Sequence, residues 1–115
     1  MVNPTLQQEI MQLEANFCAA LSDPNRLLIL YSLNESPRNV TELANEVNLN
    51  QPTASRHLKI LRDRGLVTTV RAGTTITYQL SDPRLIQALD IMRSIMRDRL
   101  AYQASLINET AQENV

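Results

Sequence analysis

The sequence contains few cysteine, glycine or aromatic residues, and no tryptophan. Its 115 residues include one cysteine, two glycines, three tyrosines and one phenylalanine. A single cysteine excludes an intrachain disulfide framework and any cysteine-cluster metal site within one chain. Two glycines leave no glycine-rich phosphate loop. The scarcity of aromatic side chains disfavours the binding of single-stranded nucleic acid by base stacking.

Long apolar runs are also missing. No stretch approaches the roughly 20 residues that a membrane-spanning helix needs, and residues 1–10 lack the basic and then apolar order of a secretory signal. We therefore expect a cytoplasmic protein without a membrane partner. A lone histidine, His57, leaves no Ser/His/Asp or Cys/His set, so the sequence does not predict an enzyme. With 43% hydrophobic residues the chain can bury one core, which predicts one domain over residues 1–115.

Charge is unevenly distributed along the chain, although its net value is only −1. Residues 1–50 carry six acidic residues against two arginines, and residues 74–115 carry five acidic residues against four arginines. Residues 51–73 instead carry five basic residues against one acidic residue, Asp63. A short basic stretch in a nearly neutral protein indicates a polyanionic partner.

Three Asx-Pro pairs predict where helices begin, because each places an N-cap residue before a proline that fits the first helical turn. The pairs are Asn3-Pro4, Asp23-Pro24 and Asp82-Pro83. They predict a helix over residues 5–20 with one apolar stripe, a buried helix over residues 24–33, and a last helix over residues 83–107. The polar tail, residues 108–115, is expected to fray.

A helix-turn-helix is predicted over residues 41–64. Thr41 is expected to cap its short first helix, which ends at Asn48, a residue type that tolerates the left-handed backbone. The second helix begins near residue 51 and ends at Gly65. Its predicted inward side chains are Ala54, Leu58 and Leu61.

The periodicity changes to that of a strand after residue 65. β-Branched residues dominate and apolar residues alternate with polar ones, which predicts a β-hairpin over residues 66–80 with its tip at Gly73. A helix-turn-helix followed directly by a hairpin is a winged helix. The predicted fold class is therefore mainly α with a small β-hairpin, in the order α-α-α-α-β-β-α.

The outer face of the second helix of the helix-turn-helix carries side chains that suit DNA. The N-terminal residues of such a helix enter the major groove, where Arg56 can bind guanine O6 and N7, and Gln51 can bind adenine N6 and N7. Lys59, Arg62 and Arg71 suit phosphate groups, which position a protein without reading sequence. The predicted DNA-binding residues are Gln51, Thr53, Ser55, Arg56, Lys59, Arg62 and Arg71.

Several motifs occur together and in order. They are LSDPNRL at residues 21–27, QPTASRHLKIL at residues 51–61, GLV at residues 65–67, Arg71-x-Gly73 and Tyr78-x-Leu80. Over roughly residues 5–105 the chain thereby resembles the ArsR/SmtB family of bacterial winged-helix repressors. The resemblance implies a homodimer joined through the first and last helices and bound to an inverted-repeat operator in double-stranded DNA. It also implies release by a metal, a metalloid, a thiol-reactive species or another signal.

Two apolar stripes, on the first and last helices, exceed what one small core can bury, and large exposed apolar patches mark interfaces. The predicted dimer-interface residues are Leu6, Ile10, Leu13, Phe17, Leu85, Leu89, Met92 and Met96.

The metal-binding signatures of the family are missing from this sequence. Thiolate sensors carry Cys-x-Cys where this chain has Asn39-Val40-Thr41-Glu42, and sensors that use the last helix need histidines, where this helix offers only Asp90 and Asp98. We therefore predict no metal site and no cofactor. His57 is expected to face DNA or solvent.

Cys18 has two interpretations. Beside Phe17 and Ala19 it is first interpreted as a small buried apolar residue, as free cysteine usually is. The alternative places it near the dimer two-fold axis, where it would make the repressor responsive to thiol oxidation. A winged helix can also serve as a protein-interaction module, but the basic outer face of the second helix argues against that function.

Overall fold

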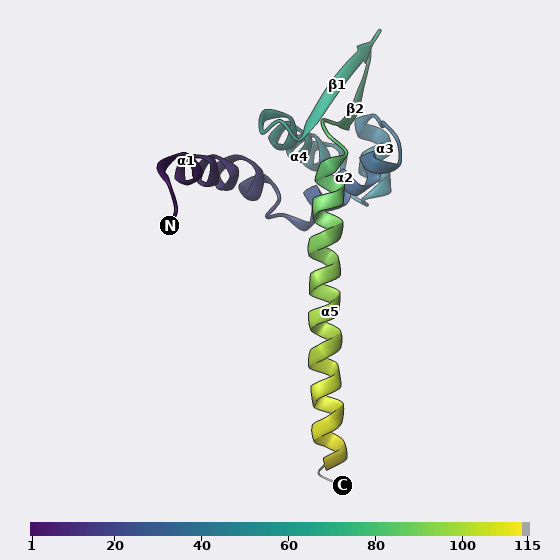
Figure 1. Cartoon of the computed structure of the whole chain (residues 1–115). Coiled ribbons are helices and arrows are strands. Elements are labelled where there is room, and N and C mark those ends of the chain that lie inside the picture. Colours follow the sequence, from purple (N-terminus) through teal and green to yellow (C-terminus); the bar gives the residue numbers. More distant parts are fainter. Residues whose placement is uncertain (114–115) are drawn as a thin grey trace. The chain divides into compact units, whose positions relative to one another are not determined.

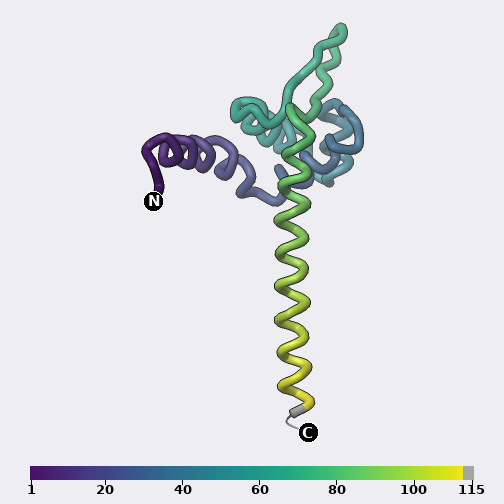
Figure 2. The backbone as a smooth tube through the Cα atoms, in the orientation of Figure 1, coloured from purple at the N-terminus to yellow at the C-terminus, as the bar shows by residue number. Residues whose placement is uncertain are grey.

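The structure is a computed structural model that describes residues 1–113 of the chain. Helix α1, a π-helical turn η1, helices α2, α3 and α4, strands β1 and β2, and helix α5 follow in that order (Figure 1). The fold class is the one predicted, a mainly helical winged helix with a two-strand wing. The chain divides into two compact units, residues 1–83 and the segment from Arg84 onward, and each is described by itself. Figure 2 traces the backbone of both by residue number.

Helix α1 (Pro4–Leu13) begins at its predicted cap, where the Leu6 N–H donates to Oδ1 of Asn3 at 2.8 Å. The π-helical turn η1 (Glu14–Cys18) follows without a break, and the helical backbone continues to Ala20. The helix predicted over residues 5–20 is therefore confirmed, but its middle is wider than expected. Because π-helical hydrogen bonds run from i to i+5, the apolar face after Leu13 is rotated relative to that of an uninterrupted α-helix.

Helix α2 (Pro24–Glu35) is capped by Asp23, whose Oδ1 accepts from the N–H of Asn25 at 2.8 Å. It extends two residues beyond the predicted end. Ile29, Leu30 and Leu33 are buried as expected of a central helix. Leu28 exposes 53% of its surface, so one face of α2 is not covered within the chain.

Helices α3 (Val40–Glu46) and α4 (Gln51–Asp63) form the helix-turn-helix. The prediction that Thr41 caps α3 is wrong. The cap is Asn39, because its Oδ1 accepts from the Glu42 N–H while the Glu42 carboxylate accepts from the Asn39 N–H, a reciprocal capping box. Asn48 then ends α3 with φ of 57°, as predicted.

Helix α4 starts and stops with defined hydrogen bonds. The Thr53 N–H donates to Oδ1 of Asn50 at the start. At the end, Gly65 takes φ of 79°, its N–H bonds the carbonyl of Arg62, and the N–H of Leu66 bonds the carbonyl of Leu61. This pair of bonds is a Schellman motif, the predicted helix end.

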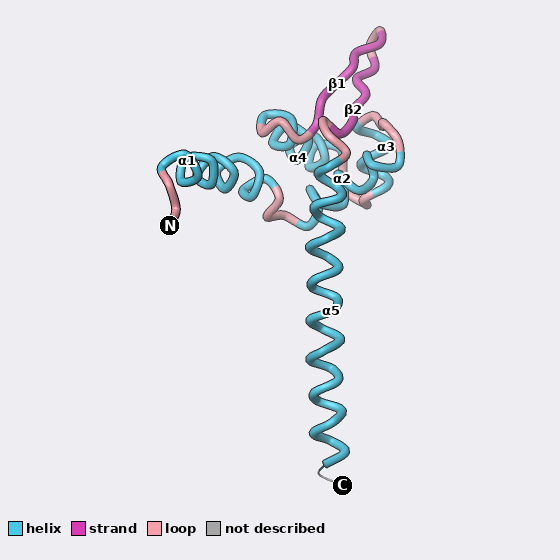
Figure 3. The backbone as a smooth tube through the Cα atoms, in the orientation of Figure 1, coloured by secondary structure: helices cyan, strands magenta, loops and turns pink. Residues whose placement is uncertain are grey.

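Strands β1 (Val67–Ala72) and β2 (Thr75–Leu80) form the antiparallel wing, drawn in magenta in Figure 3. Val67 pairs with Leu80 at the base and Ala72 with Thr75 at the tip, where Gly73 has φ of 63°. Arg38 forms a further bridge to β2, since its N–H and carbonyl bond those of Tyr78 at 3.1 and 2.8 Å. The predicted hairpin is confirmed, including its tip.

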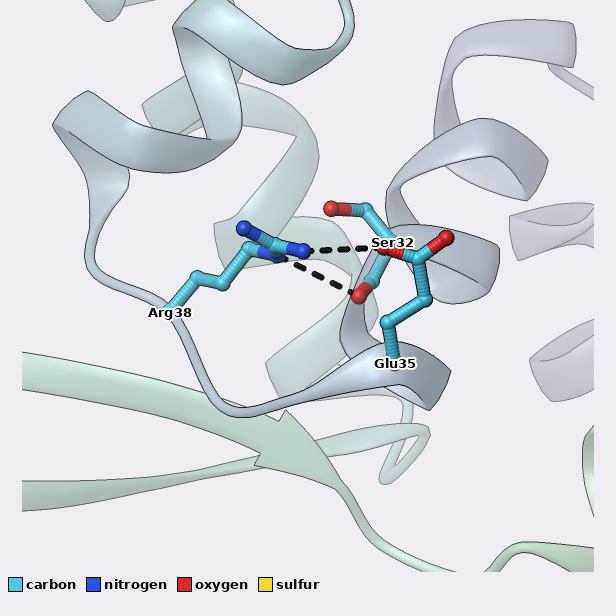
Figure 4. Close-up of polar contacts among 3 residues, drawn as sticks. All are labelled: Ser32, Glu35 and Arg38. Atoms are coloured by element: carbon cyan, nitrogen blue, oxygen red, sulfur yellow. Dashed lines mark hydrogen bonds and ion pairs between the residues drawn. The ribbon is translucent and has the colours of Figure 1, made fainter.

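The core of residues 1–83 lies where α2, α3, α4 and the base of the wing meet. Its fully buried large side chains are Ile29, Leu30, Leu43, Leu58, Leu61 and Val67. The Arg38 guanidinium holds the end of α2, because its Nε donates to the carbonyl of Ser32 at 3.3 Å and its Nη2 to Glu35 at 3.0 Å (Figure 4). The loop between α2 and α3 is thereby fixed to both the helix and the wing.

Helix α5 (Arg84–Glu113) is thirty residues long, which corresponds to about 45 Å. The prediction that residues 108–115 fray is wrong for residues 108–113, which are helical; residues 114–115 lie outside the described residues. Most large apolar side chains after Leu89 are exposed, including Met92 at 55%. None of the helices in residues 1–113 has an apolar stretch that could cross a membrane.

Candidate nucleic-acid interface

Helix α4 has one fully buried face and one exposed polar face. Ala54, Leu58 and Leu61 have no exposed surface, and their spacing places them on one stripe. Six of the seven residues predicted to contact DNA lie elsewhere on this helix. Of these, Gln51, Ser55, Arg56, Lys59 and Arg62 are exposed, and Thr53 is half-buried. The buried stripe therefore fixes which side of α4 a partner can meet.

Threonine hydroxyls hold the two side chains suited to base reading. Nε2 of Gln51 donates to Oγ1 of Thr41 at 2.7 Å, across the turn between α3 and α4. Nη2 of Arg56 donates to Oγ1 of Thr53 at 3.2 Å, within α4. Each bond restricts a long side chain before a partner arrives, which lowers the entropy lost on binding.

The two cations further along α4 share one carboxylate. Nζ of Lys59 lies 3.1 Å from Oδ2 of Asp63, and Nε of Arg62 lies 4.0 Å from Oδ1 of the same residue. All three side chains are about half exposed or more. Because exposed ion pairs contribute only about 0–1 kcal/mol, phosphate can replace the carboxylate at little cost.

A groove of about 400 Å³ separates the start of α3 from the wing. Its lining consists of residues 39–41, Ser55, residues 74–76 and Tyr78. Hydroxyl groups are frequent in this lining and none of its residues is acidic, so an anion meets hydrogen-bond donors and no carboxylate there. The remaining predicted contact, Arg71, is exposed on β1 and pairs with Ile76, itself a lining residue.

His57 does not face outward as the sequence predicted. Its ring is half-buried, and Nδ1 lies 3.3 Å from Nη1 of Arg26. The two side chains therefore lie within hydrogen-bond reach of each other. Nε of Arg26 also donates to the carbonyl of Ala20 at 2.6 Å. Arg26, which the sequence reading did not single out, thus connects the end of the first helical segment to the middle of α4.

The cap of α2 lies in the same region. Burial alone would raise the pKa of Asp23. Hydrogen bonds from the N–H groups of Asn25 and Arg26, together with attraction to His57 and Arg26, lower this pKa by more than burial raises it. The pKa of Asp23 is consequently below its ordinary value. The carboxylate is the form that caps the helix.

Comparison with known proteins agrees with this geometry. Residues 23–69 match the family described as "Bacterial regulatory protein, arsR family". The HTH-type transcriptional regulator NmtR of Mycobacterium tuberculosis is 42% identical over 76 residues, which are 66% of this chain and 63% of NmtR. The crystal structure of NolR from Sinorhizobium fredii has a TM-score of 0.71 at 37% identity, over 83% of this chain and 94% of that one.

This chain belongs to the arsR family of bacterial regulatory proteins. The predicted family is confirmed, and because its members are transcription regulators, the protein is not an enzyme. A homodimeric winged helix-turn-helix DNA-binding domain from Mycobacterium bovis, a possible ArsR-family regulator, has a TM-score of 0.75 at 26% identity, over 88% of this chain and 93% of that one.

The apolar side chains predicted to join two ArsR-family chains differ in exposure. Leu6, Ile10, Leu13 and Phe17 expose between 39% and 52% of their surface, and α1 buries no residue. On α5, Met92 and Met96 are exposed, Leu85 is half-buried, and Leu89 is buried at 6%. Leu89 is therefore already buried in the single chain, Leu85 is partly covered, and the other six residues of the set are exposed.

Cys18 is exposed, so its interpretation as a buried apolar residue of the single chain is wrong. It lies in η1, between exposed Phe17 and Ala19. The neighbouring apolar residues on α1 are exposed in the same way, so the sequence pattern around Cys18 did not distinguish a core from a surface. In the described part of the chain, no group of three or more His, Cys, Asp or Glu residues is arranged to hold a metal ion.

Proposed function

We propose that this protein binds double-stranded DNA as a homodimer at an inverted-repeat operator and represses transcription in the cytoplasm. The observation that carries the proposal is the outer face of α4. Its polar and basic side chains lie opposite a stripe with no exposed surface. Phosphate contacts supply most of the affinity of such proteins, and base-edge contacts supply the sequence preference.

The apolar stripes support a dimer. The four predicted interface residues of α1 and η1 are exposed in one chain, and so are Met92 and Met96 of α5. A second copy of the chain would cover such faces through a two-fold symmetric contact, the commonest arrangement of soluble homo-oligomers. Two copies of α4 then read two half-sites whose centres lie roughly one helical turn, or a multiple of it, apart.

Footprinting on the DNA upstream of the protein's own gene tests the proposal. We expect protection of an imperfect inverted repeat and much tighter binding to it than to a shuffled duplex of the same length. Repression of a reporter placed behind the repeat is the matching test in cells. Equal affinity for both duplexes would contradict the proposed function.

A second candidate concerns the signal. The exposure of Cys18 in the single chain favours a thiol-responsive regulator, because a thiol must be accessible to be oxidised. We expect operator affinity to be insensitive to micromolar zinc, cadmium or arsenite. The decisive comparison is the effect of peroxide on the wild type and on Cys18→Ser. A loss of affinity in the wild type alone identifies Cys18 as the sensor, and no loss in either protein excludes it.

A further inference from the structure

We propose that Thr41 is a positioning residue that couples a DNA phosphate to base reading by Gln51. This inference rests on the proposed function and adds a residue outside α4 to it. Thr41 lies in the first turn of α3, ten residues before Gln51, and both side chains are exposed. Their 2.7 Å hydrogen bond crosses the turn of the helix-turn-helix.

The hydrogen-bonding capacity of a hydroxyl provides the coupling. A threonine hydroxyl has one proton to donate and two lone pairs to accept with. By itself it can bond either end of the Gln51 amide, because it can accept from Nε2 or donate to Oε1. Once another acceptor takes the Thr41 proton, the hydroxyl can only accept from Nε2. The amide then has one orientation.

The groove beside Thr41 supplies the place for that second acceptor. Thr41 lines it together with Ser55 on α4 and Thr74 and Thr75 at the wing tip, and none of the lining residues is acidic. Within residues 1–113 no side chain accepts the Thr41 proton. Phosphate oxygens accept hydrogen bonds and donate none, and they run along both edges of a major groove that α4 would enter.

The fixed amide has a definite base preference. With one N–H of Gln51 on Thr41, the side chain keeps its Oε1 acceptor and its second N–H. This donor and acceptor pair matches N7 and the N6 amino group of adenine in the major groove. Phosphate binding at Thr41 therefore selects the orientation in which Gln51 reads adenine.

The test is a double-mutant cycle on the full-length protein and its operator. Affinity is measured for the wild type, Thr41→Val, Gln51→Ala and the double variant, against operators with each base at every half-site position. Gln51→Ala should lower the preference for adenine at one position by roughly 5- to 100-fold. Thr41→Val should lower the preference at the same position by about 2- to 10-fold, with little further loss of preference in the double variant.

Two controls make the result specific. Thr41→Ser keeps the hydroxyl and should restore the preference, while Thr69→Val removes an exposed wing hydroxyl outside the groove and should change nothing. Because the hydroxyl is neutral, the salt dependence of binding should be the same in Thr41→Val and the wild type. Thr41→Val with unchanged base preference overturns the proposal, and so does a preference change at a position that Gln51→Ala does not affect. A wild-type protein that prefers no operator contradicts the proposed function instead.

Discussion

Helix α4 and the outer helices α1 and α5 bury their apolar residues to very different extents. The apolar stripe of α4 has no exposed surface, whereas α1 buries no residue and α5 exposes apolar side chains from Ile91 to Ile107. The core of a single chain therefore determines which side of α4 is exposed to a partner. We infer that the outer helices are completed only by a second chain, so the two functions should be separable by mutation.

The largest effect is expected from breaking the second chain's contact with α5. Met92→Glu places a charge on an exposed apolar position, so the single chain can fold but its apolar face cannot pack against a copy. We expect a monomer that binds the operator at least about 100-fold more weakly, because the two half-sites no longer bind together. Sedimentation and fluorescence anisotropy measure the two effects.

A matched control for that variant must lie away from the apolar stripe of α5. Gln103 lies on the same stripe as Met92 and Met96, whereas Gln87 is exposed on the opposite side. Gln87→Glu adds the same charge there and should leave both properties unchanged. Leu89→Glu is unsuitable because Leu89 is buried, and a charge there would unfold the chain whatever its oligomeric state. A dimeric Met92→Glu protein with wild-type affinity would refute the proposed interface.

Intermediate effects should separate two kinds of contact on α4. Arg56→Ala should lose roughly 5- to 150-fold in affinity, about 1–3 kcal/mol, only on operators that carry the base it reads. Lys59→Ala should weaken binding to all sequences alike and reduce the salt slope by about one. Titrations at several salt concentrations on cognate and shuffled DNA distinguish the two. If both variants behave identically, Arg56 and Lys59 do not make different kinds of contact with DNA.

The smallest effect concerns stability rather than binding. The pKa of Asp23 is lowered in the folded chain, so its carboxylate stabilises the fold above the ordinary Asp pKa of about 3.9, and this contribution disappears as pH falls through the folded value. Asp23→Asn keeps a capping oxygen but cannot titrate. We expect urea unfolding between pH 5 and pH 3 to show a weaker pH dependence in Asp23→Asn than in the wild type.

Local signals in the sequence predicted most of the fold. Asn3, Asp23 and Gly65 determine helix ends through bonds to residues within five positions, and Asn48 tolerates the left-handed backbone by its own chemistry. The cap of α3 was missed although its signal was present. Thr41 and Asn39 are both capping residue types, and Glu42, three residues after Asn39, decides between them.

Contacts between distant residues were beyond the sequence reading. Arg26 and His57 are thirty-one residues apart, and no local pattern indicates that α2 directs a guanidinium at the inner side of α4. The exposure of Cys18 could not be predicted for a related reason. Apolar neighbours predict burial, but they do not distinguish burial in the core of one chain from burial between two chains. The polar end of α5 is rich in Gln, Glu and Ala, which favour a helix as strongly as its polarity favours solvent.

We expect Asp63 to shorten the time that the protein stays on DNA of any sequence. Its carboxylate lies 3.1 Å from the Lys59 ammonium, so every encounter with a duplex exchanges an existing ion pair for a new one and brings a negative charge toward the backbone. This exchange reduces the free energy that phosphate contacts contribute to binding any DNA sequence, in a protein whose net charge is already −1. On the operator, base contacts add to this reduced binding free energy. Asp63→Asn should therefore lengthen residence on random DNA and on the operator by similar factors, and the longer stay on random DNA would slow the search for the operator along a genome.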